Sequence, residues 1–139
     1  MNWDDSIEIL GSWLTHDGDG ARDLSVRLRK ARKIWYIFRH QLSGLRFNHS
    51  LAIRVWKSTV MSCLLYGCEI QDYPVQYLQV LRRFMNRCLR GIMHINIMTM
   101  KGVRTMTDVR LQAKVEDIET WICRRQLTWL GRTVRKGPL

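Results

Sequence analysis

Apolar side chains recur at steps of three and four residues along most of this 139-residue chain. Between residues 23 and 42 the recurring positions are Leu24, Leu28, Ala31, Trp35, Phe38 and Leu42. This spacing places them on one face of an α-helix, because a helix turns once in about 3.6 residues. Such a face is stable mainly when another apolar surface covers it. The chain is therefore predicted to fold as helices packed against one another.

Two central helices are predicted from the same spacing together with capping residues. The first of them begins at Asn48 or Ser50 and ends near Tyr66, because Asn and Ser side chains accept hydrogen bonds from the first backbone amides of a helix. The next opens at Asp72 and Pro74, since aspartate is a good cap and proline is tolerated in a first helical turn. Its apolar stripe comprises Leu78, Leu81, Met85, Cys88 and Ile92.

The two ends of the chain carry different signals. Residues 7–14 alternate apolar side chains in the manner of a single β-strand, and residues 16–20 have the Gly and Asp content of a turn. Near the other end, Thr107 is predicted to cap a short helix through Ala113. A last helix spans residues 115–134, with acidic residues first and basic residues last, which complements the helix dipole.

These signals predict a mainly α fold, with a short N-terminal strand or arm followed by a bundle of about four to five amphipathic helices. We expect residues 1–20 to form the strand and turn, and residues 21–136 to form one helical domain. Residues 137–139 are a tail.

The charge of the chain is strongly positive. It has 23 Lys and Arg against 12 Asp and Glu, and the first 20 residues hold no Lys or Arg at all. A positive field of this size attracts polyanions, of which nucleic-acid backbones are the commonest. The alternative is a solvated basic surface without a specific partner. No run of about 18 apolar residues predicts a membrane span, and no signal region follows the N-terminus, so we expect an intracellular, nuclear or cytoplasmic protein.

Basic side chains gather on particular helix faces. Arginine suits a nucleic-acid contact because its planar guanidinium binds phosphate oxygens with two hydrogen bonds. Most tryptophans fall on apolar stripes, which favours core packing, whereas Tyr36 lies nearer a basic face and is the best candidate to stack on a base. The predicted nucleic-acid-binding residues are Arg22, Arg29, Lys33, Tyr36, Arg83, Arg87, Arg90, Arg124, Arg125, Arg132 and Arg135.

No catalytic constellation is found in the sequence. Asp17 and Asp19 indicate a solvated turn rather than a metal site, and the four histidines are scattered. The cysteines do not have the spacing of a zinc site, and they are interpreted as buried, reduced thiols. They are Cys63, Cys68, Cys88 and Cys123. We therefore expect a chain without enzymatic activity, metal or cofactor of its own.

Five segments, taken in order, resemble motifs of the LINE-type (non-LTR) retrotransposon reverse transcriptases. Residues 9–14 resemble the segment that closes the palm, and residues 28–33 the start of the helical region beyond it. Leu64–Glu69 resembles the LLYG-x-E motif, and residues 81–92 the F-x-R-R-C-L-R-x-I helix. Arg124–Gly131 resembles the R-x-L-x-W-L-G box near the end of that region.

The resemblance implies the thumb and connection of an RNA-directed DNA polymerase, whose helices hold a template–primer duplex, such as an RNA–DNA hybrid, by its backbone. On this resemblance, residues 1–20 would be the end of a palm-like region, with the strand segment near the primer grip, and residues 21–136 would be the thumb and connection. The polymerase aspartates, the magnesium they bind and the endonuclease domain have no counterpart in this chain.

Two alternatives stay open: a helical interaction subunit that docks on a separate polymerase palm, and a decayed reading frame without selected function. A DNA-binding regulator is disfavoured, because the helices are too long and too evenly basic for a helix–turn–helix.

Overall fold

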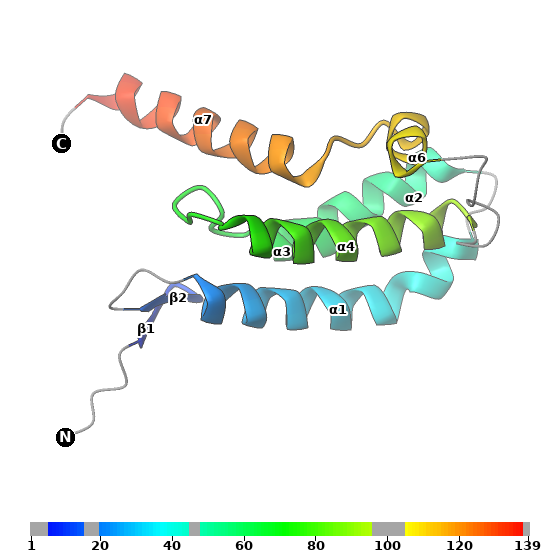
Figure 1. Ribbon diagram of the computed structural model, residues 1–139, viewed down its shortest axis with the longest axis horizontal. Helices are drawn as coiled ribbons and strands as arrows, with labels where there is room; N and C mark the ends of the chain where they lie inside the picture. Colours follow the sequence, from blue (N-terminus) through cyan, green and yellow to red (C-terminus); the bar gives the residue numbers. More distant parts are fainter. Residues whose placement is uncertain (1–5, 16–19, 45–47, 96–104, 138–139) are drawn as a thin grey trace.

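A computed structural model shows the helices packed side by side around α4 (Val75–Ile92) (Figure 1). The structure describes residues 6–15, 20–44, 48–95 and 105–137. The helices in contact with α4 are α1 (Ala21–Gly44), α2 (His49–Trp56), α6 (Met106–Ala113) and α7 (Ile118–Lys136). The described residues are mainly helical, which confirms the predicted fold class.

The N-terminal segment is a β-hairpin rather than the single predicted strand. β1 (Ser6–Ile9) and β2 (Ser12–Thr15) pair antiparallel, with the first residue of β1 opposite the last of β2. Leu10 and Gly11 form a two-residue turn in which both φ angles are positive, 50° and 78°. Such turns match the twist of paired strands. The alternating pattern predicted Gly11 as part of a strand, whereas Gly11 lies in the turn where the chain reverses direction. The turn predicted at residues 16–20 lies, except for its last residue, outside the described residues.

The second helix is one rod with a wider turn in its middle. It consists of α2, the π-helical turn η1 (Lys57–Met61) and α3 (Ser62–Leu64). Asn48 caps it as predicted, since its Oδ1 accepts a hydrogen bond from the Leu51 amide at 3.0 Å. The rod ends two residues before the predicted Tyr66, and the chain then turns through Gly67, whose φ is 75°.

Two predicted caps are wrong. Pro74 is the N-cap residue of α4 and makes no side-chain cap, so Asp72 does not cap this helix. For α6 the cap is Thr105 rather than Thr107: the Asp108 amide donates to the Thr105 hydroxyl at 3.3 Å, and the Asp108 carboxylate accepts from the Thr105 amide at 2.8 Å. The reciprocal pair satisfies two backbone donors, which a threonine inside the helix cannot do.

The last two helices are separated more sharply than predicted. Lys114 adopts a left-handed conformation (φ 53°) and ends α6, and Asp117 caps α7 by accepting from the Glu119 amide at 3.4 Å. The predicted helix start at Val115 therefore lies in the link between them.

The predicted apolar stripes form the core. On α1, Trp35 and Phe38 are partly buried against it, and the other four stripe positions are fully buried. On α4, all stripe residues are buried except Leu78, which packs at the edge. Trp56 is completely enclosed and meets Trp121 edge to face, with ring centroids 6.3 Å apart. Local periodicity alone thus identified the buried face of both helices.

Candidate nucleic-acid interface

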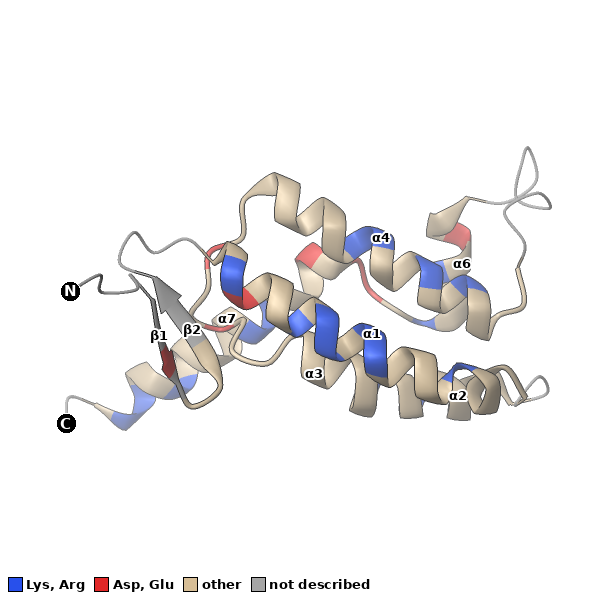
Figure 2. Ribbon diagram, turned by 90° about the horizontal axis from the view of Figure 1, so that it is seen from below, with Lys and Arg blue, Asp and Glu red and all other residues tan. Residues whose placement is uncertain are grey.

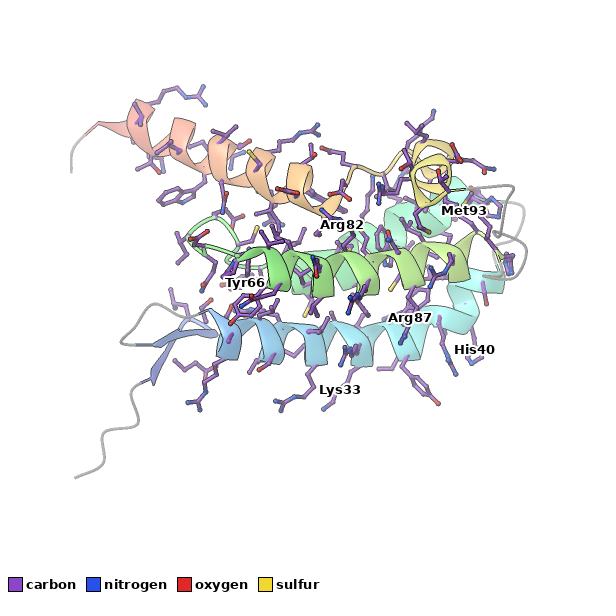
Figure 3. All side chains as sticks on the ribbon, in the orientation of Figure 1. Lys33, His40, Tyr66, Arg82, Arg87 and Met93 are labelled. Atoms are coloured by element: carbon purple, nitrogen blue, oxygen red, sulfur yellow. The ribbon has the colours of Figure 1, made fainter. Side chains whose placement is uncertain are left out.

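The predicted residues of α1 share one solvent-exposed row. Arg22, Arg29, Lys33 and Tyr36 are separated by seven, four and three residues, and all four are exposed. Lys33 points away from the bundle (Figure 3). Tyr36 is 66% exposed, but the Arg39 guanidinium lies 4.3 Å from the centroid of its ring and covers one face. One face of this ring therefore remains for stacking.

The predicted residues of α4 lie beside this row. Arg83 and Arg87 are exposed, and they line a groove of about 290 Å³ together with Arg32 of α1. Its apolar lining comes from Val80 and Phe84. Arg90 is half-buried and its Nη1 lies 4.0 Å from the sulfur of Met106. Packing of α1 against α4 thus brings basic side chains of two helices to one groove.

We define the α1/α4 basic face by five exposed basic residues along the groove and the adjoining row, leaving out Arg22 in the first turn of α1. They are Arg29, Arg32, Lys33, Arg83 and Arg87. Bands of Lys and Arg on both helices are visible from this side (Figure 2). α4 contains no Asp or Glu, and the only acid of α1, Asp23, is buried. Within the described part of the chain, no carboxylate lies within 4.0 Å of these five charged groups.

Arg32 was missed by the sequence prediction. On a helical wheel it lies about 70° from the centre of the predicted row of α1, since each residue advances the helix by about 100°. Only the position of α4 shows that this side faces a groove rather than open solvent. No signal in the sequence would have identified it.

The predicted residues of α7 lie elsewhere. α7 packs on the side of α4 opposite α1, and the two do not touch in the described residues (Figure 1). Arg124 pairs with Glu116 at 2.6 Å and Arg125 with Glu69 at 2.7 Å. Arg132 and Arg135 are exposed near the end of the helix. The predicted set is therefore divided between two surfaces, and half of its α7 members are neutralised by carboxylates.

An ionic contact between Arg82 and the start of α7 holds α7 against α4. Arg82 donates to both carboxylate oxygens of Asp117, at 3.1 and 2.9 Å, and also pairs with Glu119 at 3.2 Å (Figure 3). Burial raises the pKa of Asp117, but the hydrogen bonds and charge of Arg82 outweigh it, so this pKa lies below its ordinary value. Arg82 therefore holds two helices together through these carboxylates, whereas the adjacent Arg83 is exposed.

A buried arginine holds the hairpin against α1. Arg27 donates to the carbonyl of Gly11 and, at 2.9 Å, to the hydroxyl of Ser12. Its Nε lies 3.6 Å from the carboxylate of Asp23, and its guanidinium lies 4.5 Å from the centroid of the Tyr66 ring. Asp23 and Arg27 are 1% and 5% exposed. This contact positions the segment that the resemblance placed near a primer grip.

The cysteines divide into buried and accessible thiols. Cys68 and Cys88 are buried as predicted, Cys63 is half-buried, and Cys123 is exposed on α7, which contradicts the prediction for that residue. Burial raises the pKa of Cys68 to about 11 and that of Cys88 to about 12.

Because only the thiolate attacks disulfide reagents, the exposed Cys123 should react fastest with Ellman's reagent at about pH 8. The two buried thiols should react only on unfolding, so Cys123→Ser should abolish the fast phase. Persistence of that phase would contradict the assignment.

The described residues include no group of three or more His, Cys, Asp or Glu side chains that could hold a metal ion. No helix in the described ranges is long and apolar enough to cross a membrane. Comparison of the chain with protein families, curated proteins and solved structures finds no match.

Proposed function

We propose that this chain is a non-catalytic module, similar to the thumb and connection of a LINE-type reverse transcriptase, that holds a template–primer duplex by its phosphate backbone. The observation that carries this proposal is the α1/α4 basic face. Three exposed arginines from two adjacent helices line one groove, two further exposed cations of α1 lie on the adjoining row, and no described carboxylate pairs with any of the five. Such a surface supplies the electrostatic part of nucleic-acid binding, which does not depend on base sequence.

Contacts between resembling motifs support the same proposal. Glu69 is the last residue of the segment that resembles LLYG-x-E, and Arg125 is the second residue of the segment that resembles R-x-L-x-W-L-G. Arg125 donates to Glu69 through both Nε, at 2.9 Å, and Nη2, at 2.7 Å. The side chain of the neighbouring Gln126 donates to the carbonyls of Cys68 and Gln71, at 3.0 and 2.9 Å. Two segments that resemble motifs far apart in the sequence are thus in direct contact through Arg125 and Glu69.

The hairpin is joined to the same loop. Tyr66 belongs to the LLYG-like segment, and its hydroxyl lies 3.4 Å from the carbonyl of Leu10 in the hairpin turn. Arg27 connects the two segments from the side of α1. A fixed hairpin beside a basic helix pair is the arrangement that the thumb proposal requires, because a primer end must be positioned relative to the duplex grip.

Binding of a labelled RNA–DNA hybrid, followed by fluorescence anisotropy, tests the proposal. If each of the five cations neutralises one phosphate, the slope of log K against log salt should be about −4.5. Affinity should then fall about 500-fold between roughly 50 and 200 mM salt. Binding that is absent at low salt, or independent of salt, would sink the proposal.

A matched pair of variants locates the contact. Arg83→Gln/Arg87→Gln should make the salt slope shallower by about 2 and weaken binding to all sequences alike. Arg132→Gln/Arg135→Gln removes the same charge from exposed positions of α7 and should leave the slope unchanged. An equal loss in both variants would show that net charge, rather than the α1/α4 basic face, attracts the hybrid.

A second candidate function, a subunit that docks on another protein, is favoured by α7. Leu127, Leu130 and Val134 follow one another at helical spacing and are 63%, 51% and 71% exposed. An apolar stripe of this kind is a common docking surface for a partner. Failure of the parent chain to bind the hybrid at low salt would favour this candidate over the first.

A further inference from the structure

A second basic cavity lies between α2 and α6, away from the α1/α4 basic face. Its volume is about 310 Å³, at the lower end of the range for ligand pockets. α6 lies on the opposite side of α4 from α1 (Figure 1). The polar residues that line the cavity are His49, Ser50, Arg54, Lys57, Gln112 and Lys114.

The cavity combines three permanent cations with no described acid in its lining. Arg54 and Lys57 come from the α2 rod, and Lys114 comes from the end of α6. Like charges gathered around one hollow repel one another, and a bound anion relieves that repulsion. Ile53 and Ala113 supply an apolar lining, which strengthens the attraction by excluding water.

Lys57 is held in position. Its Nζ donates to the backbone carbonyl of Lys114 at 3.4 Å and lies 5.7 Å from the centroid of the Trp121 ring. Lys57 is also the first residue of the π-helical turn. Hydroxyls support that turn: Thr59 donates to the carbonyl of Val55 at 2.7 Å. Single π-turns occur frequently at functional sites, because they redirect side chains that a regular helix would place elsewhere.

Lys114 occupies a backbone position that favours glycine. Its φ of 53° lies in the left-handed region, and helices that end in this way usually have Gly or Asn there. A lysine at this position is strained, and nothing in the capping of α6 requires it. Its long cationic side chain is what distinguishes it from glycine, and this residue lines the cavity.

We propose that the cavity between α2 and α6 binds a phosphate group, as a site separate from the α1/α4 basic face. A phosphate has several acceptor oxygens around one centre. The guanidinium fork of Arg54 and the ammonium groups of Lys57 and Lys114 donate to such an anion from both helices. The hydroxyl of Ser50 and the amide of Gln112 add neutral donors. The first turn of α2 contributes the positive end of its dipole.

Titration of the ¹⁵N-labelled full chain with inorganic phosphate at constant ionic strength tests this proposal by NMR. The largest shifts are expected at the amides of residues 49–57 and 112–114. Lys57→Gln should weaken binding about tenfold, because it removes one charge-assisted hydrogen bond. Lys136→Gln removes an exposed lysine outside the cavity and should bind as the parent chain does.

Lys114→Gly separates loss of binding from loss of folding. Glycine relieves the positive φ, so this variant should melt at the same temperature as the parent chain or higher, while its affinity for phosphate falls about tenfold. In the Arg83→Gln/Arg87→Gln variant, the shifts at residues 49–57 and 112–114 should titrate with phosphate as they do in the parent chain, because neither arginine lines the cavity. Unchanged affinity in both lysine variants, absence of shifts, or shifts confined to α1 and α4 would overturn the proposal.

Two further ligands identify the source of the phosphate. A nucleoside 5′-monophosphate presents a terminal phosphate, and a trinucleotide without terminal phosphates presents only diesters. Stronger shifts with the monophosphate would assign the cavity to a terminal or free phosphate. Equal or stronger shifts with the trinucleotide would assign it to a nucleic-acid backbone. Failure of both ligands and of inorganic phosphate to shift these amides overturns the site.

Discussion

Trp56→Ala should lower the free energy of unfolding by about 3–5 kcal/mol, measured by urea denaturation with far-ultraviolet circular dichroism. Trp56 ends α2 and is 0% exposed. Alanine would remove its buried apolar surface and leave a cavity that rigid neighbours on α4 and α7 cannot fill. A domain of this size is stable by only about 5–15 kcal/mol, so the variant would lose a large part of its stability.

Trp129→Ala is the matched control, because it removes the same side chain from a position that is 44% exposed. Its cost should stay below about 1 kcal/mol. If the two variants were equally destabilised, the enclosed position of Trp56 at the centre of the bundle would be contradicted.

Arg27→Met should also lower the free energy of unfolding by about 3–5 kcal/mol. The substitution removes the cation that lies 3.6 Å from the buried carboxylate of Asp23, and it removes the hydrogen bonds to Gly11 and Ser12. A buried carboxylate that loses the attraction of a neighbouring cation still carries the cost of leaving water. Arg29→Met is the control on the same helix, since Arg29 is exposed, and should change stability by less than about 0.5 kcal/mol.

The double variant Asp23→Asn/Arg27→Met separates the stability lost through charge burial from the stability lost with the hydrogen bonds to Gly11 and Ser12. It removes the buried charge of Asp23 together with that of Arg27, so it should be more stable than Arg27→Met in urea denaturation. The hairpin amides should exchange hydrogen faster in both variants than in the parent chain, because both variants lack the contacts to Gly11 and Ser12. Equal stability of the single and double variants would contradict the explanation by charge burial.

The helices were predictable because their signals are local. The stripe on α1 and the stripe on α4 each repeat over several turns, and the side chains that face the core are determined by helical geometry alone. Boundaries were less accurate. The turn at Leu10–Gly11 and the cap at Thr105 depend on which backbone groups find partners in the fold, so nearby alternatives such as Thr107 looked equally suitable.

The candidate interface was predictable only in part. The rows on α1 and on α4 follow from spacing within each helix. All of their predicted residues are exposed except Arg90, which is half-buried. Arg124 and Arg125 have the same local signal, yet each pairs with a carboxylate. Glu69, the partner of Arg125, is 56 residues away in sequence. No spacing rule within one helix reveals such a partner.

The basic helical surface was therefore determined by the sequence one helix at a time. The order of residues decides which side of a helix is apolar and which is cationic, because neighbouring positions are related by a constant rotation. Only the tertiary structure decided which cationic sides share a groove and which cations are paired. It also brought Lys57 and Lys114 together across the α2–α6 cavity. Distances between helices depend on how their apolar faces pack, and that packing joins residues far apart in the chain.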